Sequence, residues 1–242
     1  MINKISWKDI FENFLKSKKI SSYSYKNLLL AAGHYNSKSG GYKVIDWLKE
    51  CRFIESKLNL KKKEKILEIG CGSGALLKFF VKKYKIYGAD YSKCLISLAN
   101  KALPQGSFKL TEASKIDYKK SFFQAVIMQS CIQYFSSEKY FSRVIEKTSK
   151  ILGKNGKLFI GEIVDEDNLK KFIEYRKKKI GIENYKKLYT GEKNRNLKFF
   201  TISRDQIIKI LKKKFKNFEI YNCLMRGDEK DCYRFNLVCT KK

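Results

Sequence analysis

The chain has 242 residues, 43% of them hydrophobic, which suffices for one domain with a buried core. No stretch approaches 18 consecutive apolar residues and no apolar signal region opens the sequence, so we expect neither a transmembrane helix nor a secreted protein. Seven scattered cysteines without a C-x-x-C pair, together with a single histidine, exclude a zinc site, so we expect no bound metal and a cytoplasmic protein with reduced thiols.

The net charge of +29 has two interpretations. It indicates a polyanionic partner, such as a nucleic acid, or it reflects the base composition of the gene, since the chain is also rich in Ile, Asn, Phe and Tyr and has one proline. The lysines occur in most predicted elements, which favours the second interpretation. We therefore expect lysines on all faces rather than around an active-site opening.

Residues 1–60 are predicted to be helical. Apolar residues recur at helical spacing near the start, over 25–32 and over 44–58. The segment 33–41, between the predicted helices over 25–32 and 44–58, is a loop by its Gly, Ser and Asn content, and it contains His34 and Tyr35.

A short apolar strand over 65–69 leads into the glycine-rich turn 70–74, and a predicted helix follows. Glycines allow a ligand to approach the backbone, and the start of a helix offers free N–H groups to an anion. The same turn fits a dinucleotide fingerprint, because Asp90 follows about 20 residues later. The glycines alone leave both ligands open.

Glu68 favours one ligand, because Glu68-x-Gly70-x-Gly72-x-Gly74 resembles the first motif of the class I S-adenosylmethionine (SAM) methyltransferases. The resemblance implies that the loop, including Cys71, runs under the methionine part of SAM. It also implies that Glu68 binds or orients that part.

Three later segments resemble further motifs of that family. Asp90 ends the second predicted strand, where the resemblance implies an acid that accepts both ribose hydroxyls, and Tyr91, which follows it, is expected beside the cofactor. Glu112 and Ala113 follow the third strand, where it implies an acid that reaches the adenine amino group. Gln129 ends the fourth strand, where the resemblance implies a contact with the cofactor.

The segment after Gln129 is implied to run into the active site, so we expect Gln133, Tyr134 and, after the later insertion, Phe200 to contact the acceptor along with Tyr35. Candidate general bases are Glu162, near the end of the fifth strand, and His34. Signatures for adenine or glutamine N-methylation and for cytosine C5 methylation are absent.

Strands and helices alternate from residue 65, which predicts an α/β fold of the Rossmann-like type. We expect a seven-stranded, mostly parallel sheet with a C-terminal antiparallel strand pair. An N-terminal helical cap (1–60) precedes the SAM-binding domain (61–242), and a helical insertion (164–202) on the acceptor side precedes the last helix. The residue types predict a turn at 153–156 and a capping box, Ser203 to Gln206, at the start of that last helix.

Three functions remain possible. The first is SAM-dependent methylation, at oxygen or nitrogen, of a small acceptor such as a sugar, a cell-surface component or a secondary metabolite. The second is an RNA methyltransferase, suggested by charge, although no RNA-binding module is visible. The third is an NAD-dependent oxidoreductase, from the fingerprint overlap.

Overall fold

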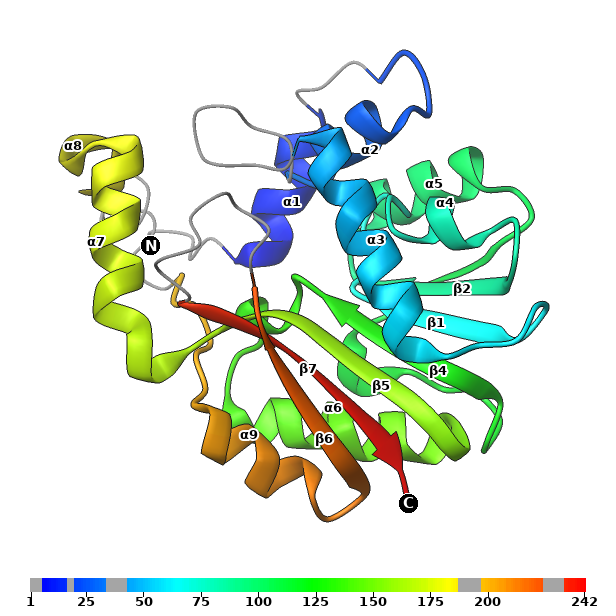
Figure 1. The fold of residues 1–242 in the computed structure, drawn as a ribbon. Helices are drawn as coiled ribbons and strands as arrows, with labels where there is room; N and C mark the ends of the chain where they lie inside the picture. The colour runs from blue at the N-terminus through cyan, green and yellow to red at the C-terminus, as the bar shows by residue number, and fades with distance from the viewer. Residues whose placement is uncertain (1–5, 17–19, 34–42, 187–196, 224–232) are drawn as a thin grey trace.

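A seven-stranded sheet forms the centre of the computed structural model, which describes residues 6–16, 20–33, 43–186, 197–223 and 233–242 (Figure 1). The strand order is β3-β2-β1-β4-β5-β7-β6. The strands are β1 (Lys65–Ile69), β2 (Lys85–Asp90), β3 (Ser107–Leu110), β4 (Phe123–Gln129), β5 (Leu152–Val164), β6 (Phe215–Asn222) and β7 (Arg234–Lys241). β1 to β5 are parallel, and β7 runs antiparallel between β5 and β6. The predicted fold class is confirmed.

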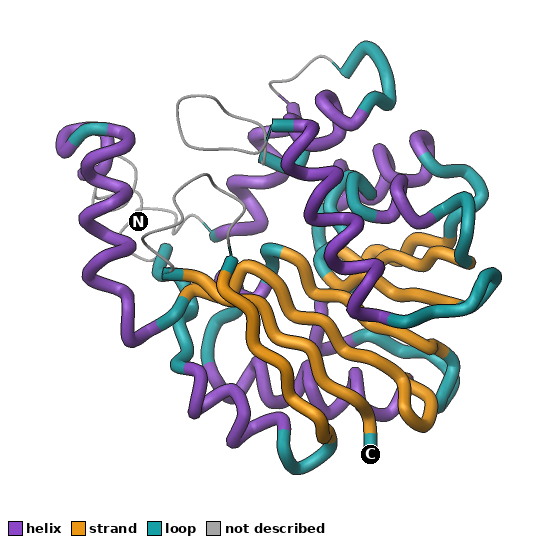
Figure 2. Tube along the Cα trace, viewed as in Figure 1, coloured by secondary structure: helices purple, strands orange, loops and turns teal. Residues whose placement is uncertain are grey.

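Helices cover both faces of the sheet (Figure 2). One core joins α2, α3, α4 and α5 to the sheet, and a second joins α6 and α9 to the other face. The insertion forms α7 and α8. The helices are α1 (Trp7–Lys16), α2 (Tyr25–Ala31), α3 (Val44–Leu58), α4 (Leu77–Phe80), α5 (Lys93–Ala102), α6 (Glu138–Ile151), α7 (Leu169–Ile180), α8 (Ile182–Tyr185) and α9 (Arg204–Leu211).

The predicted N-terminal cap is not one unit. Trp47, Cys51 and Ile54 of α3 are buried in the same core as Ile66 and Phe159 of the sheet, so α3 is a covering helix of the main sandwich. α1 instead lies over the carboxyl ends of the strands (Figure 1). The boundary at residue 60 therefore falls inside a continuous core.

Two local predictions differ from the structure. The helix after the glycine loop is only one turn long, because residues up to 76 remain in the loop. The segment 153–156, predicted as a turn, is the start of β5. The capping box that opens α9 is confirmed, with Gln206 N donating to Ser203 Oγ (3.2 Å) and Ser203 N to Gln206 Oε1 (3.1 Å).

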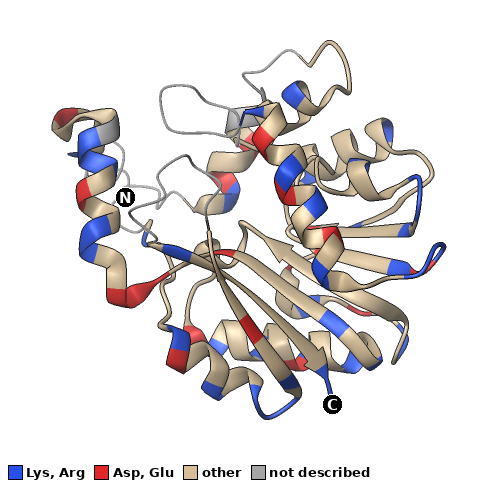
Figure 3. Cartoon of the chain, viewed as in Figure 1, with Lys and Arg blue, Asp and Glu red and all other residues tan. Residues whose placement is uncertain are grey.

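The lysines are not spread evenly (Figure 3). We define the amino edge as the six segments where the chain enters β1, β2, β4, β5 and β6 or leaves β7. Its 31 residues hold 18 lysines and two acids, a net charge of +16. We define the carboxyl edge as the five segments that follow β1 to β5, whose 32 residues hold two lysines and six acids, a net charge of −4. The amino edge comprises residues 61–65, 82–85, 117–122, 150–157, 212–217 and 241–242, and the carboxyl edge comprises 70–76, 90–93, 111–115, 129–137 and 162–168.

Candidate active site

A cavity of about 630 Å³ lies at the carboxyl edge, within the size range of small-molecule sites. The glycine loop, the ends of β2 and β3 and the loop after β4 supply its floor and sides, and α1 and residues 197–198 supply the opposite wall. Segments far apart in sequence therefore enclose one space.

The glycine loop folds tightly at the end of β1. The amides of Gly70 and Cys71 both donate to Ala89 O of β2, at 2.7 and 3.1 Å. Gly70 has φ +76°, and a Cβ there would lie 2.5 Å from Cys131 Cβ, so only glycine fits. Gly70 and Gly72 line the cavity with bare backbone, which leaves room for a ligand.

Asp90 ends β2 at the wall of the cavity. Its two carboxylate oxygens accept hydrogen bonds from Gly72 N and Ser92 N, both at 2.9 Å. Burial raises the pKa of Asp90, and the backbone hydrogen bonds oppose this. Each oxygen keeps a lone pair that can accept a hydrogen bond from a hydroxyl group of a ligand.

Glu68 lies beneath the loop and is 3% exposed. Its Oε2 atom has no hydrogen-bond partner among the described residues. Burial raises the pKa of Glu68 well above its usual range, and the nearby Asp90 adds to this. Glu68 is not among the described residues that line the cavity. A buried acid with an unpaired oxygen behind a glycine cradle still fits the amino acid part of SAM, because an ammonium group that reached it through the loop would supply the missing partner.

Three other predicted cofactor residues line the cavity: Tyr91, Glu112 and Ala113. Glu112 is exposed and pairs with Lys115 at 3.2 Å. Two loop residues do not line it among the described set. The Cys71 thiol faces Gly88 of β2, and Gly74 packs against Ala99 and Leu103 of α5.

An aromatic group forms the wall opposite the glycine loop. Tyr134 contacts Trp7 and Phe11 of α1 edge-on, with ring centroids 4.9 and 5.1 Å apart. Trp7 also stacks on Phe199 at 5.2 Å and donates from Nε1 to Lys198 O (3.4 Å). This aromatic wall joins the N-terminal helix, the loop after β4 and the end of the insertion.

α1 is attached to the cofactor side through Glu12, whose Oε1 accepts from Lys93 N at the start of α5 (2.6 Å). Partial burial raises the pKa of Glu12, but hydrogen bonds from Cys94, Lys93 and Ser92 outweigh this and hold it below its usual value. A helix N-terminus favours such an anion. α1 therefore connects the cofactor side of the cavity with the aromatic wall.

Gln129, Gln133 and Phe200 are not among the described residues that line the cavity. Gln129 Nε2 donates to Glu50 Oε1 (3.4 Å). The Gln129 side chain packs directly against Gly161, so a Cβ at Gly161 would collide with it. Gln133 Nε2 donates to Ser130 O (2.8 Å), and the Gln133 carbonyl accepts from Phe200 N (2.9 Å). These residues shape the loop after β4 from behind.

Glu162 is fully buried at an irregularity of β5, with φ +60°, and is also absent from the described lining of the cavity. Arg234 Nη1 donates to its carbonyl (2.8 Å) and lies 3.5 Å from Oε2, while Cys223 Sγ donates to Oε1 (2.9 Å). Asn236 Oδ1 accepts from Glu162 N at 2.9 Å. Its carboxylate therefore faces β7 and the end of β6.

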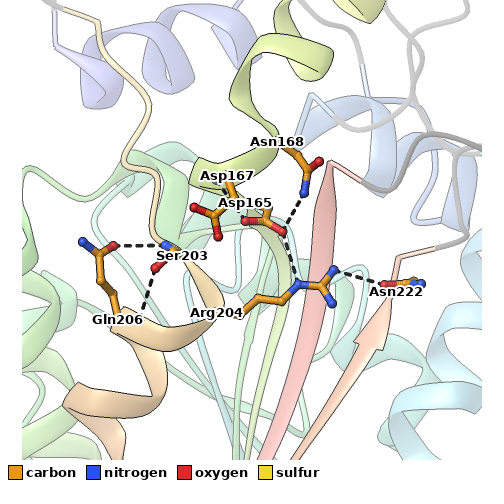
Figure 4. A network of polar contacts seen from close by, with 7 residues as sticks. All are labelled: Asp165, Asp167, Asn168, Ser203, Arg204, Gln206 and Asn222. Atoms are coloured by element: carbon orange, nitrogen blue, oxygen red, sulfur yellow. Dashed lines mark hydrogen bonds and ion pairs between the residues drawn. The ribbon is translucent and has the colours of Figure 1, made fainter.

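Asp165 anchors the chain beyond β5 (Figure 4). Its carboxylate accepts from Asp167 N (3.2 Å), Asn168 Nδ2 (3.1 Å) and Arg204 Nε (3.2 Å). Arg204 also donates to Asn222 Oδ1 at 3.1 Å. The network ties the start of the insertion to α9 and β6, and so fixes where the insertion leaves the sheet.

His34 and Tyr35 lie outside the described residues, so their predicted roles are untested. In the part of the chain that the structure describes, no group of three His, Cys, Asp or Glu residues could hold a metal. No helix within the described ranges is long and apolar enough to cross a membrane.

Sequence reasoning missed many of the lining residues, among them Trp7 and Phe11 of α1, Ala32, Ser130 and Lys198. Ser130 follows β4 with φ +51°, and its buried Oγ has no partner among the described residues. Phe11 belongs to an apolar stripe visible in the sequence, but nothing local showed that the stripe faces a cavity rather than a core.

Comparison with known proteins agrees with this geometry. Residues 66–156 match the family model of a methyltransferase domain. A demethylmenaquinone methyltransferase of Thermotoga maritima is 27% identical over 112 residues, which are 45% of this chain and 47% of that protein, so the match spans about half of the relative.

Solved structures share the fold over a larger part of the chain. A possible histamine N-methyltransferase from Thermotoga maritima aligns with a TM-score of 0.61 and 19% identity, over 96% of this chain and 98% of that one. The N-methyltransferase NodS from Bradyrhizobium japonicum, in complex with S-adenosylhomocysteine, aligns with a TM-score of 0.59 and 13% identity, over 81% and 86%. At these identities the likeness shows the fold. The domain match indicates the methyltransferase family for residues 66–156.

The glycine cradle, the buried Glu68 beneath it and Asp90 at the end of β2 are compatible with SAM, the cofactor of the matching family. Residues 66–156 match a methyltransferase domain, and the chain has the fold of the class I, SAM-dependent methyltransferases.

Proposed function

We propose that the protein transfers the methyl group of SAM to a small-molecule acceptor held against the aromatic wall. The observation that carries this proposal is the shared cavity, which has the cofactor loop on one side and Trp7, Phe11 and Tyr134 on the other. Flat or apolar acceptor groups suit such a wall, because aromatic side chains bury large apolar areas.

In this proposal Gly70 and Gly72 contact the cofactor through their backbone, and Asp90 accepts hydrogen bonds from the ribose hydroxyls. The adenine ring of the cofactor is surrounded by Tyr91, Glu112 and Ala113. Glu68 receives the amino group from beneath, while Cys71 and Gly74 shape the loop. The cofactor supplies a methyl group on a positively charged sulfur. The protein aligns the acceptor with it and excludes water, and alignment of this kind accounts for much of the catalysis.

Glu162 and His34 stay as proposed bases for acceptors that must lose a proton. Because Glu162 is bound to Arg234 and Cys223, we favour for it a positioning role at the ends of β5 and β7. Gln129, Gln133, Tyr35 and Phe200 are proposed to position the acceptor side.

An RNA acceptor is less consistent with the charge distribution. Among the described residues, the lysines that line the cavity are Lys8 and Lys198, whereas the dense positive charge lies at the opposite edge of the sheet. The match of residues 66–156 to a methyltransferase domain favours a methyltransferase over an NAD-dependent oxidoreductase.

The test is to incubate the protein with methyl-labelled SAM and either the small-molecule or the RNA fraction of a cell extract. We expect label in low-mass products. Trp7→Ala should lower turnover and leave S-adenosylhomocysteine affinity unchanged, whereas Tyr23→Ala, an exposed aromatic elsewhere, should change neither. Label confined to RNA would contradict the proposal.

A further inference from the structure

The lysines of the amino edge form a continuous patch rather than isolated charges. Phe215 pairs with Lys241 and Lys216 with Thr240 in the β6–β7 ladder. Lys242 donates to the carbonyls of Lys214 and Lys212, at 3.1 and 2.6 Å. The end of β7 is thereby held against the segment 212–217.

A third segment joins this patch. Partial burial lowers the pKa of Lys241, and the positive charges of Lys214 and Lys120 lower it further. Lys120 precedes β4, Lys214 precedes β6, and Lys241 ends β7. Lysines from three parts of the chain therefore repel one another across this edge, and a bound polyanion would relieve that repulsion.

Few of these charges are neutralised internally. Lys83 pairs with Glu55 at 2.9 Å and Lys150 with Glu146 at 2.8 Å. The other amino-edge lysines have no carboxylate oxygen within 4.0 Å among the described residues. The positive potential is therefore available to a partner.

The chemistry of the edge favours a phosphate backbone. Its cations are all lysines, which bind phosphates as point charges and do not provide the forked geometry that reads planar groups. In the described ranges, the exposed large apolar residues (Tyr23, Ile45, Leu110 and Ile182) lie outside this edge.

Three aromatic residues of the edge, Tyr84, Tyr118 and Phe122, are partly buried, and Phe215 is fully buried. Lysine ammonium groups cover two of these rings, Lys65 Nζ over Phe122 at 3.8 Å and Lys109 Nζ over Tyr118 at 4.1 Å. The edge therefore presents little apolar surface to a bilayer or to unpaired bases, which favours a phosphate backbone.

We propose that the amino edge is a docking surface for the phosphate backbone of double-helical nucleic acid, RNA or DNA. The surface is separate from the active site, because the strands place the two edges about 20 Å apart, at roughly 3.3 Å per residue over a strand of about six residues. The docked helix is thus not the methyl acceptor, and the inference does not depend on which acceptor is used.

The test compares two variants that each remove four positive charges. In the edge variant Lys212, Lys213, Lys214 and Lys216 are replaced by Gln. In the control variant Lys170, Lys171, Lys177 and Lys178 of α7, which are also exposed, are replaced by Gln. Binding to duplex RNA, duplex DNA and anionic vesicles is measured by fluorescence anisotropy or sedimentation between 50 and 300 mM salt.

We expect wild-type protein to bind both duplexes. In the edge variant the slope of log affinity against log salt should fall by about 1 for each phosphate that the protein no longer neutralises. The control variant should retain most of the slope. Saturating S-adenosylhomocysteine should leave duplex binding unchanged, and both variants should keep wild-type thermal unfolding. If the edge variant does not fold, a second variant tests the same edge. It combines Lys61→Gln, Lys62→Gln and Lys63→Gln.

Equal losses in the two variants would overturn the proposal, because they would show diffuse attraction to the net charge. Tighter binding to vesicles than to duplex at equal phosphate concentration would overturn it in favour of a membrane surface. Absence of duplex binding by the wild-type protein at 100 mM salt would also overturn it.

Discussion

The same strands end at two edges that have opposite chemistry. Over 31 residues the amino edge carries a net charge of +16, while over 32 residues the carboxyl edge carries −4. A parallel sheet makes this separation possible, because every crossover returns the chain to the same edge before the next strand begins. One edge can then hold a binding site while the other meets a different partner.

The two edges also differ in burial. Glu68, Asp90, Glu162 and Asp165 are all buried at or beneath the carboxyl edge, whereas most amino-edge lysines are exposed. Changes at the carboxyl edge should therefore alter stability and ligand binding. Changes at the amino edge should alter association with other molecules.

The largest expected effect concerns Glu50 of α3, which lies beneath the carboxyl edge and accepts from Gln129 and Asn236. Burial, then the charge of Glu162, raises its pKa to about 8. Between pH 4.5 and about 8 the unfolded chain ionises this group while the folded protein does not, so stability should fall as pH rises. The slope is up to about 1.4 kcal/mol per pH unit.

Denaturant unfolding at pH 5 and pH 8 measures this difference. Glu50→Gln should reduce the slope by up to about 1.4 kcal/mol per pH unit, while the raised pKa of Glu68 maintains a pH dependence of the same sign. Glu55→Gln, on the same helix but paired with Lys83, should keep the wild-type dependence. The same pH dependence in Glu50→Gln as in the wild type would contradict the assignment.

The next effect concerns cofactor binding. Asp90→Ala removes the carboxylate proposed to accept the ribose hydroxyls and should weaken S-adenosylhomocysteine binding by about 1–3 kcal/mol in calorimetry. Asp117→Asn, at the amino edge, should leave the affinity unchanged. An Asp90→Ala protein with wild-type affinity would remove Asp90 from the site.

Gly→Ala substitutions at the two ends of β5 allow the stability of the two edges to be compared within one strand. A Cβ at Gly161 would collide with Gln129 and lie 2.7 Å from Phe159 Cε1, so Gly161→Ala should cost about 1–2 kcal/mol of unfolding free energy. A Cβ at Gly153, at the amino edge, would meet Phe123 O at 3.5 Å, an ordinary contact. Gly153→Ala should therefore change stability by less, and equal losses in thermal unfolding would contradict this difference.

The smallest effect concerns the exposed Lys83–Glu55 pair at the amino edge. A double-mutant cycle with Lys83→Gln and Glu55→Gln should give a coupling of about 0.2–1 kcal/mol that declines with salt. A larger coupling that persists in high salt would show that this edge is less solvated than the structure indicates.

The parts predicted from sequence are those that local chemistry determines. The glycine loop, Asp90 and the capping box at Ser203 are each set by residues within a few positions, and all three are found where expected. The sheet followed from the alternation of apolar runs.

The parts that were not predicted depend on contacts between distant segments. Trp7 meets Phe199 across 192 positions, a distance along the chain that no periodicity reports. Glu162 was expected at the acceptor side, but an irregularity in β5 and the pairing with β7 direct its carboxylate toward Arg234. The uneven charge was equally hidden, because lysines scattered along the sequence converge only when the strands align.

The placement of β7 has a consequence for how the protein is made. This strand is buried from Arg234 to Thr240 and fills the position between β5 and β6, although it comes after both in the chain. Until it has emerged from the ribosome, β5 presents an open hydrogen-bonding edge and the rest of the sheet cannot close. Synthesis of residues 165–233 therefore leaves an interval in which the nascent chain is open to aggregation, so we expect chaperone dependence and ribosome pausing to affect this protein's yield most strongly within that interval.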